Sequence, residues 1–278
     1  MQPHWTQNDA TVNGVRLHYY RTGNGDKRPL VLVHGFSDNG LCWAPTARDL
    51  ESEYDAIMPD MRGHGLSARV RPDESVDMAQ DLAGLIQALG LKRPIVCGHS
   101  MGAMVTYQIG VRFPKLARAL ILEDPPFRIS SPFPSPTSDP SAENPIVAWA
   151  KDLPNHSLEE LLAGYKKDHP DWSEEFIRTM CESKKQLDPA IADIMSKRIH
   201  SPEVDWKTTF PGVTLPTLLF AGDPKLGGIV TPEVVSEIRR LNPKVNVVSV
   251  PDVGHLIRFD KFPAFMEAVQ AFLKKLPS

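Results

Sequence analysis

Residues 94–102 read PIVCGHSMG, a short apolar run followed directly by Gly98-His99-Ser100-Met101-Gly102, which fits the pattern G-x-S-x-G. The residues from Ser100 to Arg112 have a helical pattern that ends before Pro114. A serine between a strand and a helix in this pattern sits on a sharp turn, and the flanking glycines remove Cβ atoms that would collide with neighbouring backbone. The hydroxyl of Ser100 is therefore expected to project above the edge of a sheet, where the start of the helix favours negative charge.

The rest of the chain alternates short apolar runs with longer helical patterns. Buried parallel strands read as unbroken apolar runs, and this alternation is typical of a mostly parallel sheet with helices on both faces. The predicted strands are residues 12–20, with a turn at Asn13-Gly14, and residues 30–33, 55–58, 95–97, 119–122, 218–220 and 245–250. The predicted helices are residues 73–89, 100–112, one that opens at Thr231-Pro232, and about 263–275.

The composition excludes several classes of protein. The chain has 278 residues, 41% of them apolar, and a formal net charge of −3 without a basic cluster, which argues against a nucleic-acid partner. No apolar run reaches the roughly 18 residues that span a bilayer, and the first residues lack the basic and apolar regions of a secretory signal. The three cysteines are far apart and fit no zinc motif. We therefore expect a cytoplasmic protein with reduced thiols, no cofactor, no metal and no membrane contact.

The strand–helix alternation is interrupted between about residues 127 and 212, where a proline-rich stretch precedes several helical patterns. Insertions of this kind often carry function. We predict a helical lid over residues 127–212, inserted after the sixth strand, and a core formed by residues 1–126 and 213–278. Three aromatic residues of the lid, Phe127, Trp149 and Trp172, are candidates to line a substrate pocket. The alternative is that they form the lid's own core.

Three further motifs lie where loops leave a predicted sheet. His34-Gly35-Phe36 ends an early strand, and the N–H groups of Phe36 and Met101 are candidates for the two donors that acyl transfer needs at its oxyanion. His34 itself is expected to fix this loop by hydrogen bonding, and DMRGHGLS (60–67) predicts a tight turn that supports it. Gly254-His255 follows the last strand, from which His255 can reach the serine hydroxyl as a base.

In this order, HGF (34–36), DMRGHGLS (60–67), GHSMG (98–102) and GH (254–255) resemble the motifs of the α/β-hydrolase superfamily. The resemblance covers about residues 12–126 and 213–276. It implies the α/β-hydrolase fold, with Ser100 as nucleophile, His255 as base, and the N–H groups of Phe36 and Met101 as oxyanion donors. It also implies that the acid partner of the histidine lies between Ser100 and His255 in the chain.

The acid is where this sequence departs from the family pattern. Most relatives carry an aspartate in the loop after the next-to-last strand, but Lys225 and Gly227 stand at the two positions that align with it, and Asp223 is only nearby. Some relatives place the acid after the strand that follows the nucleophile helix, where this chain has Glu123-Asp124. Adjacent carboxylates point to opposite sides of an extended chain, so only one of them can serve. We favour Glu123, then Asp223, then Asp124.

A serine at the turn argues against the dehalogenases and most epoxide hydrolases of this fold, which resemble this chain but use aspartate there. It favours acyl-enzyme chemistry. We predict a serine hydrolase that cleaves a carboxylic ester or a lactone of a small, fairly apolar molecule. Two alternatives stay open: a hydrolase-like receptor that binds a small ligand with little turnover, and a C–C bond hydrolase or acyltransferase that uses the same residues.

Overall fold

An eight-stranded sheet runs through the computed structural model, which describes residues 2, 4–71, 74–127, 145–198 and 205–277, and its strand order is β1-β2-β4-β3-β5-β6-β7-β8. The strands are β1 (Thr6–Val12), β2 (Val15–Arg21), β3 (Arg28–Val33), β4 (Tyr54–Pro59), β5 (Ile95–His99), β6 (Ala119–Glu123), β7 (Thr217–Ala221) and β8 (Asn246–Ser249). β2 is antiparallel to β1 and β4, and the other neighbours are parallel. The predicted mostly parallel sheet is therefore confirmed.

The first two strands form a tight hairpin. The predicted turn at Asn13-Gly14 is confirmed: both residues have positive φ, 51° and 75°, and Val12 pairs with Val15 across it. Positive φ at both central residues is what a two-residue turn needs to match the twist of its strands. The predicted strand over residues 12–20 is thus only the second arm of a hairpin that begins at Thr6.

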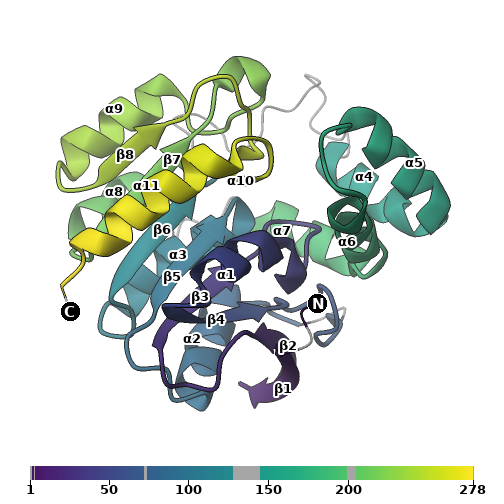
Figure 1. The fold of residues 1–278 in the computed structure, drawn as a ribbon, viewed down its shortest axis with the longest axis horizontal. Coiled ribbons are helices and arrows are strands. Elements are labelled where there is room, and N and C mark those ends of the chain that lie inside the picture. Colours follow the sequence, from purple (N-terminus) through teal and green to yellow (C-terminus); the bar gives the residue numbers. More distant parts are fainter. Residues whose placement is uncertain (1, 3, 72–73, 128–144, 199–204, 278) are drawn as a thin grey trace.

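Helices cover both faces of the sheet (Figure 1). Successive side chains of a strand point to opposite faces, so Leu120 and Leu122 of β6 belong to one apolar cluster, and Ala119 and Ile121 belong to the other. The first cluster contains residues of α2 (Met78–Ala88), α3 (Met101–Arg112) and α9 (Pro232–Leu241). The second contains residues of α1 (Ala44–Leu50), α10 (Ile257–Asp260) and α11 (Phe262–Lys275).

Two helices differ from the sequence prediction. α2 begins at Met78 because the Asp77 side chain accepts a hydrogen bond from Gln80 N and so caps the helix. Residue 73, where the predicted helix began, lies outside the described residues. α1 was not predicted; its seven residues follow a 3₁₀ turn, Gly40–Trp43, and are too few to display a helical period of apolar residues.

The predicted helical insertion follows β6, the sixth strand. Its described helices are α4 (Pro145–Asp152), α5 (Leu158–Asp168), α6 (Glu174–Lys185), α7 (Pro189–Arg198) and α8 (Trp206–Thr209). Figure 1 shows α4, α5 and α6 as a group at one side of the molecule, next to the sheet and its covering helices. The boundaries of the core, 1–126 and 213–278, and of the lid, 127–212, remain a prediction.

Candidate active site

Ser100 occupies the sharp turn between β5 and α3. Its backbone has φ 52° and ψ −116°, a conformation that few residues other than glycine adopt. A Cβ atom at Gly98 would overlap the carbonyl oxygen of Gly102, and a Cβ atom at Gly102 would overlap that of Val33. Ser100 N donates a hydrogen bond of 2.9 Å to Glu123 O, at the end of β6. The turn is thus held by close backbone packing that only glycine permits at 98 and 102.

His255 is paired with Asp124. His255 Nδ1 donates to Asp124 Oδ2 at 2.6 Å, and the Asp124 side chain is fully buried. The same carboxylate accepts hydrogen bonds from Ile229 N, at 2.8 Å, and from Val230 N, at 3.0 Å. These donors fix the carboxylate, and the carboxylate fixes the ring so that Nδ1 carries the proton and Nε2 keeps its lone pair.

The prediction that Glu123 is the acid partner of His255 is wrong. Glu123 Oε1 accepts from Arg258 N and Oε2 accepts from Arg258 Nη1, both at 2.7 Å, and this ion pair is buried. Glu123 lies two residues after Ile121 and four after Ala119 on β6, so its side chain points to the same face of the sheet as theirs, the face that α1 and α11 cover. Asp124 lies one residue beyond the strand at φ 42°, and this left-handed backbone turns its carboxylate toward His255.

The second choice, that Asp223 is the acid partner of His255, is also wrong. Its carboxylate accepts from Lys225 N at 2.8 Å and caps a 3₁₀ turn, Pro224–Leu226. Its backbone N donates to Val253 O, which ties the loop after β7 to the loop that carries His255. Asp223 therefore belongs to the local structure of its own loop, and Asp124, the third alternative, is the residue that meets the histidine.

His99, directly before the serine, links the turn to the His255 loop. Its Nε2 donates to His255 O at 3.0 Å, and the two ring centres are 4.6 Å apart. Complete burial lowers the pKa of His99 well below its usual value, so this ring is neutral. This contact was not predicted from the sequence, although the position of His99 beside Ser100 was a signal for it.

The loop from His34 to Asn39, called here the 34–39 loop, begins beside the serine turn. Val33 of β3 pairs with Gly98 of β5, so the chain leaves the two strands at neighbouring places. His34 Nδ1 donates to Gly35 O at 2.8 Å, and His34 Nε2 accepts from Met61 N at 2.9 Å. Burial lowers the pKa of His34 to about 4, so it is neutral. The prediction that His34 fixes this loop is confirmed.

The turn over residues 60–67 supports the 34–39 loop, as predicted. Asp60 accepts hydrogen bonds from Gly40 N and Leu66 N, each at 2.7 Å. The His64 ring lies 4.9 Å from the His34 ring and 6.2 Å from the Phe36 ring, measured between centres. His64 is therefore part of the packing behind Phe36.

The three aromatic residues predicted to bind substrate have different surroundings. Phe127 is fully buried and stacks on Trp206 with 5.2 Å between ring centres. Trp149 is 42% exposed on α4. Trp172 donates from Nε1 to Asp260 Oδ1, which links the insertion to α10. These contacts describe how the three side chains pack or are exposed in the insertion and its surroundings, and a role of the three residues in substrate binding remains a prediction.

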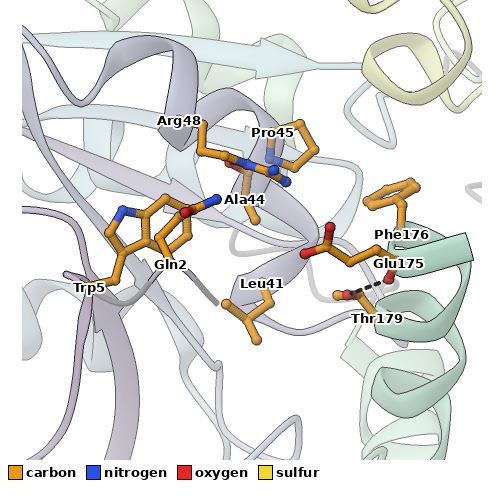
Figure 2. Close-up of a pocket in the computed structure, with 9 residues that line it drawn as sticks. All are labelled: Gln2, Trp5, Leu41, Ala44, Pro45, Arg48, Glu175, Phe176 and Thr179. Carbon is orange, nitrogen blue, oxygen red and sulfur yellow. Dashed lines mark hydrogen bonds between the residues drawn. The ribbon is translucent and has the colours of Figure 1, made fainter. Parts of the chain in front are cut away.

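Figure 2 shows a pocket between the N-terminal segment, the 3₁₀ turn Gly40–Trp43 with α1, and α6. Arg48 and Glu175 bring charges of both signs to it. Neither Ser100 nor His255 is among its lining residues, so it is separate from the candidate active site. The residues that line it are Gln2, Trp5, Leu41, Ala44, Pro45, Arg48, Glu175, Phe176 and Thr179.

Within the described ranges, no helix is long and apolar enough to cross a bilayer. The same residues contain no group of three or more His, Cys, Asp or Glu side chains placed to hold a metal ion. Cys42, Cys97 and Cys181 are all buried free thiols.

The chain matches a known family along most of its length. Residues 30–268 fit the model of the Alpha/beta hydrolase family, and the chain therefore belongs to this family. Together with the eight-stranded sheet, this match confirms the predicted α/β-hydrolase fold.

Named relatives of the chain are hydrolases. It is 30% identical over 273 residues to an N-formylmaleamate deformylase of Pseudomonas putida, with 95% of each chain covered. It is 27% identical over 265 residues to Lipase 1 of Psychrobacter immobilis, covering 94% of this chain and 81% of the lipase. The crystal structure of an E-2-(acetamidomethylene)succinate hydrolase superposes with a TM-score of 0.78 at 22% identity, covering 98% of this chain and 100% of that one, which is a likeness of fold.

Proposed function

We propose that this protein is a serine hydrolase that forms an acyl-enzyme, with Ser100 as nucleophile, His255 as general base and Asp124 as the acid that orients it. The observation that carries this proposal is the 2.6 Å hydrogen bond from His255 Nδ1 to the buried Asp124 carboxylate. This bond leaves Nε2 as the proton acceptor, and the hydrogen bond from His99 to His255 O holds the loop of the base against the serine turn.

In the proposed reaction, Ser100 Oγ attacks the carbonyl carbon while His255 Nε2 takes the hydroxyl proton. Asp124 stabilises the imidazolium that forms. His255 then gives the proton to the leaving group as its bond to the acyl carbon breaks. Water attacks the acyl-enzyme with His255 as base once more, and this step releases the acid and restores the Ser100 hydroxyl.

The proposed oxyanion donors are the N–H groups of Phe36 and Met101. Met101 is the first residue of α3, where N–H groups have no partner within the helix. Phe36 shares a peptide unit with the Gly35 carbonyl that His34 binds, and a trans peptide directs its N–H away from that carbonyl. Two such donors stabilise the tetrahedral intermediate by roughly 3–4 kcal/mol each in comparable sites.

For the substrate, we propose a carboxylic ester or lactone of a small, fairly apolar molecule, bound beneath a lid formed by residues 127–212. The relationship to a lipase over 94% of this chain supports the ester. A second candidate is an N-acyl amide, supported by the 30% identity to an N-formylmaleamate deformylase across 95% of both chains. The same Ser100 chemistry serves both, and they differ in the leaving group.

The test is a panel of esters, lactones and N-acyl amides offered to the wild type and to Ser100→Ala, with products identified by mass spectrometry. We expect multiple turnovers by the wild type on at least one class and a loss of at least 10³-fold in Ser100→Ala. A single burst without turnover would favour the receptor alternative. Products of C–C cleavage or acyl transfer would favour the alternative of a C–C bond hydrolase or an acyltransferase. Activity in Ser100→Ala above half the wild-type kcat contradicts the proposal.

A further inference from the structure

The 34–39 loop is tied to the last turn of α6 by buried side chains. Lys184 Nζ donates to Asp38 Oδ1 at 2.7 Å and to Ser37 O at 3.3 Å. Lys184 and Asp38 are 3% and 4% exposed, so this ion pair is shielded from water. Asn39 Nδ2 also donates to Gln186 Oε1, at 2.9 Å, just after the helix.

Ser37 needs external support. Its φ of 67° is in the left-handed region that favours glycine. The hydroxyl of Ser183 lies 3.1 Å from Ser37 O but also 2.7 Å from Met180 O in its own helix, and its one proton serves only one of them. Lys184 has three protons and binds Ser37 O and the Asp38 carboxylate together. Lys184 is therefore the main link between α6 and this turn.

Asp38 is connected in turn to the peptide of the proposed oxyanion donor. Asp38 N donates to Gly35 O at 3.2 Å, beside the bond from His34 Nδ1 to the same oxygen. Gly35 O and the N–H of Phe36 belong to one planar peptide unit. Whatever fixes the direction of this carbonyl also fixes the direction of the N–H of Phe36.

The charge on Lys184 is retained in this buried place. Burial alone lowers the pKa of the ammonium group, but the negative charge of the Asp38 carboxylate opposes this effect, and the pKa of Lys184 is raised above its usual value. The ammonium also lies 5.9 Å from the centre of the Tyr165 ring of α5. The ion pair therefore persists at neutral pH.

We propose that Lys184 of α6 is a positioning residue for the oxyanion donor Phe36 N–H, acting through Ser37, Asp38 and the Gly35 carbonyl. This inference rests on the proposed function, because it assigns a purpose to the direction of that N–H. It places part of the control of transition-state binding on a helix of the insertion rather than on the sheet.

The test compares Lys184→Met with Lys185→Met. Lys185 is the next residue of the same helix turn and is exposed, and it donates only to Pro154 O and His156 O within the described residues. Active sites are counted by mass after labelling with a fluorophosphonate, so a fraction of misfolded protein does not affect the rate per site. The measurements are kcat and KM for p-nitrophenyl acetate and the inhibition constant of phenylboronic acid, which forms a tetrahedral adduct.

In Lys184→Met we expect kcat per titrated site to fall by about tenfold to a hundredfold, as small displacements of catalytic groups do. KM should stay within twofold, and the inhibition constant of the boronic acid should rise by the same factor as kcat falls. Lys185→Met should stay within twofold of the wild type in all three. A kcat per site within twofold of the wild type in Lys184→Met, with only fewer titratable sites, overturns the proposal.

If Lys184→Met does not fold, the double variant Lys184→Met/Asp38→Asn removes both buried charges and avoids an unpaired carboxylate. We expect kcat per titrated site of the double variant to be about tenfold to a hundredfold below the wild-type value, as in Lys184→Met. A kcat per site equal to that of the wild type overturns the proposal. Ser100→Ala separates this inference from the proposed function. A kcat of Ser100→Ala above half the wild-type value defeats the proposed function. A loss of at least 10³-fold in Ser100→Ala together with a fully active Lys184→Met defeats only the role of Lys184.

Discussion

Glu123 and Asp124 are neighbours in the chain, yet their carboxylates bind different partners on different sides of the end of β6. Asp124 accepts from His255 Nδ1 at 2.6 Å, and Glu123 accepts from Arg258 Nη1 at 2.7 Å. Both partners belong to the segment between β8 and α11, and the backbone oxygen of Glu123 also holds Ser100 N. This pair of residues therefore joins the serine turn to the histidine loop. The Asp124 carboxylate binds His255, and the Glu123 carboxylate binds Arg258.

Asp124→Asn should lower kcat by about 10⁴-fold with the fold preserved. An amide at 124 can donate to His255 and so favours the wrong tautomer, and it does not stabilise an imidazolium. The matched control is Asp223→Asn, the same change at a capping residue, which should leave kcat within twofold. Steady-state kinetics on any hydrolysed ester measures both. A larger loss in Asp223→Asn than in Asp124→Asn would reverse the assignment.

Glu123→Gln should act mainly on stability. The Glu123 carboxylate and the Arg258 guanidinium are 0% and 2% exposed, so the change leaves a buried cation without its counter-charge. Breaking one partner of a buried pair costs about 3–5 kcal/mol. Urea unfolding followed by circular dichroism measures the loss. A free energy of unfolding equal to that of the wild type would show that this pair contributes nothing.

Acid should destabilise the protein through its buried neutral histidines. Burial lowers the pKa of His34 to about 4 and of His64 to about 3, against 6.5 in the unfolded chain. Between about pH 6.5 and pH 4 the unfolded state therefore binds more protons, and the free energy of unfolding falls as the pH falls. His64→Phe should reduce this slope by up to about 1.4 kcal/mol per pH unit. The measurement is urea unfolding of the wild type and of His64→Phe at several pH values. An equal dependence of the free energy of unfolding on pH in the two proteins would contradict a neutral buried His64.

Gly98→Ala should destabilise the protein by about 3 kcal/mol or more, because the added methyl group overlaps the Gly102 carbonyl and the backbone cannot move away. Gly164→Ala is the control. An added Cβ at Gly164 of α5 meets nothing within 4 Å, and the change should stabilise the helix by about 0.5–1 kcal/mol. Thermal unfolding of both variants, with shifts in opposite directions, checks the packing of the serine turn.

The serine turn was predictable because its requirements are local. Gly98 and Gly102 stand two residues to either side of Ser100, and the strand and helix that flank them show in the apolar pattern. The strand segments and α3 were identified for the same reason. α1 was missed because seven residues give too little pattern.

The carboxylate partner of His255 was not predictable from the sequence, because the pairing depends on a contact between residues that are distant in the chain. Asp124 and His255 are 131 residues apart, and the choice between Glu123 and Asp124 turns on where β6 ends and on the positive φ of Asp124. A sequence shows two carboxylates on opposite sides of a strand end, but not which side the histidine loop occupies. The link from Lys184 to Asp38 spans 146 residues and has no sequence signature either.

The most direct test is covalent labelling with a fluorophosphonate, which reacts with a serine that a neighbouring base has activated. Intact mass and peptide mapping should find a single adduct, on Ser100, in the wild type. The labelling rate should fall by at least 10³-fold in His255→Ala and Asp124→Asn, and should be unchanged in Asp223→Asn. An adduct on another residue, or labelling of Ser100 at the wild-type rate in Asp124→Asn, would contradict the assignment of Ser100, His255 and Asp124.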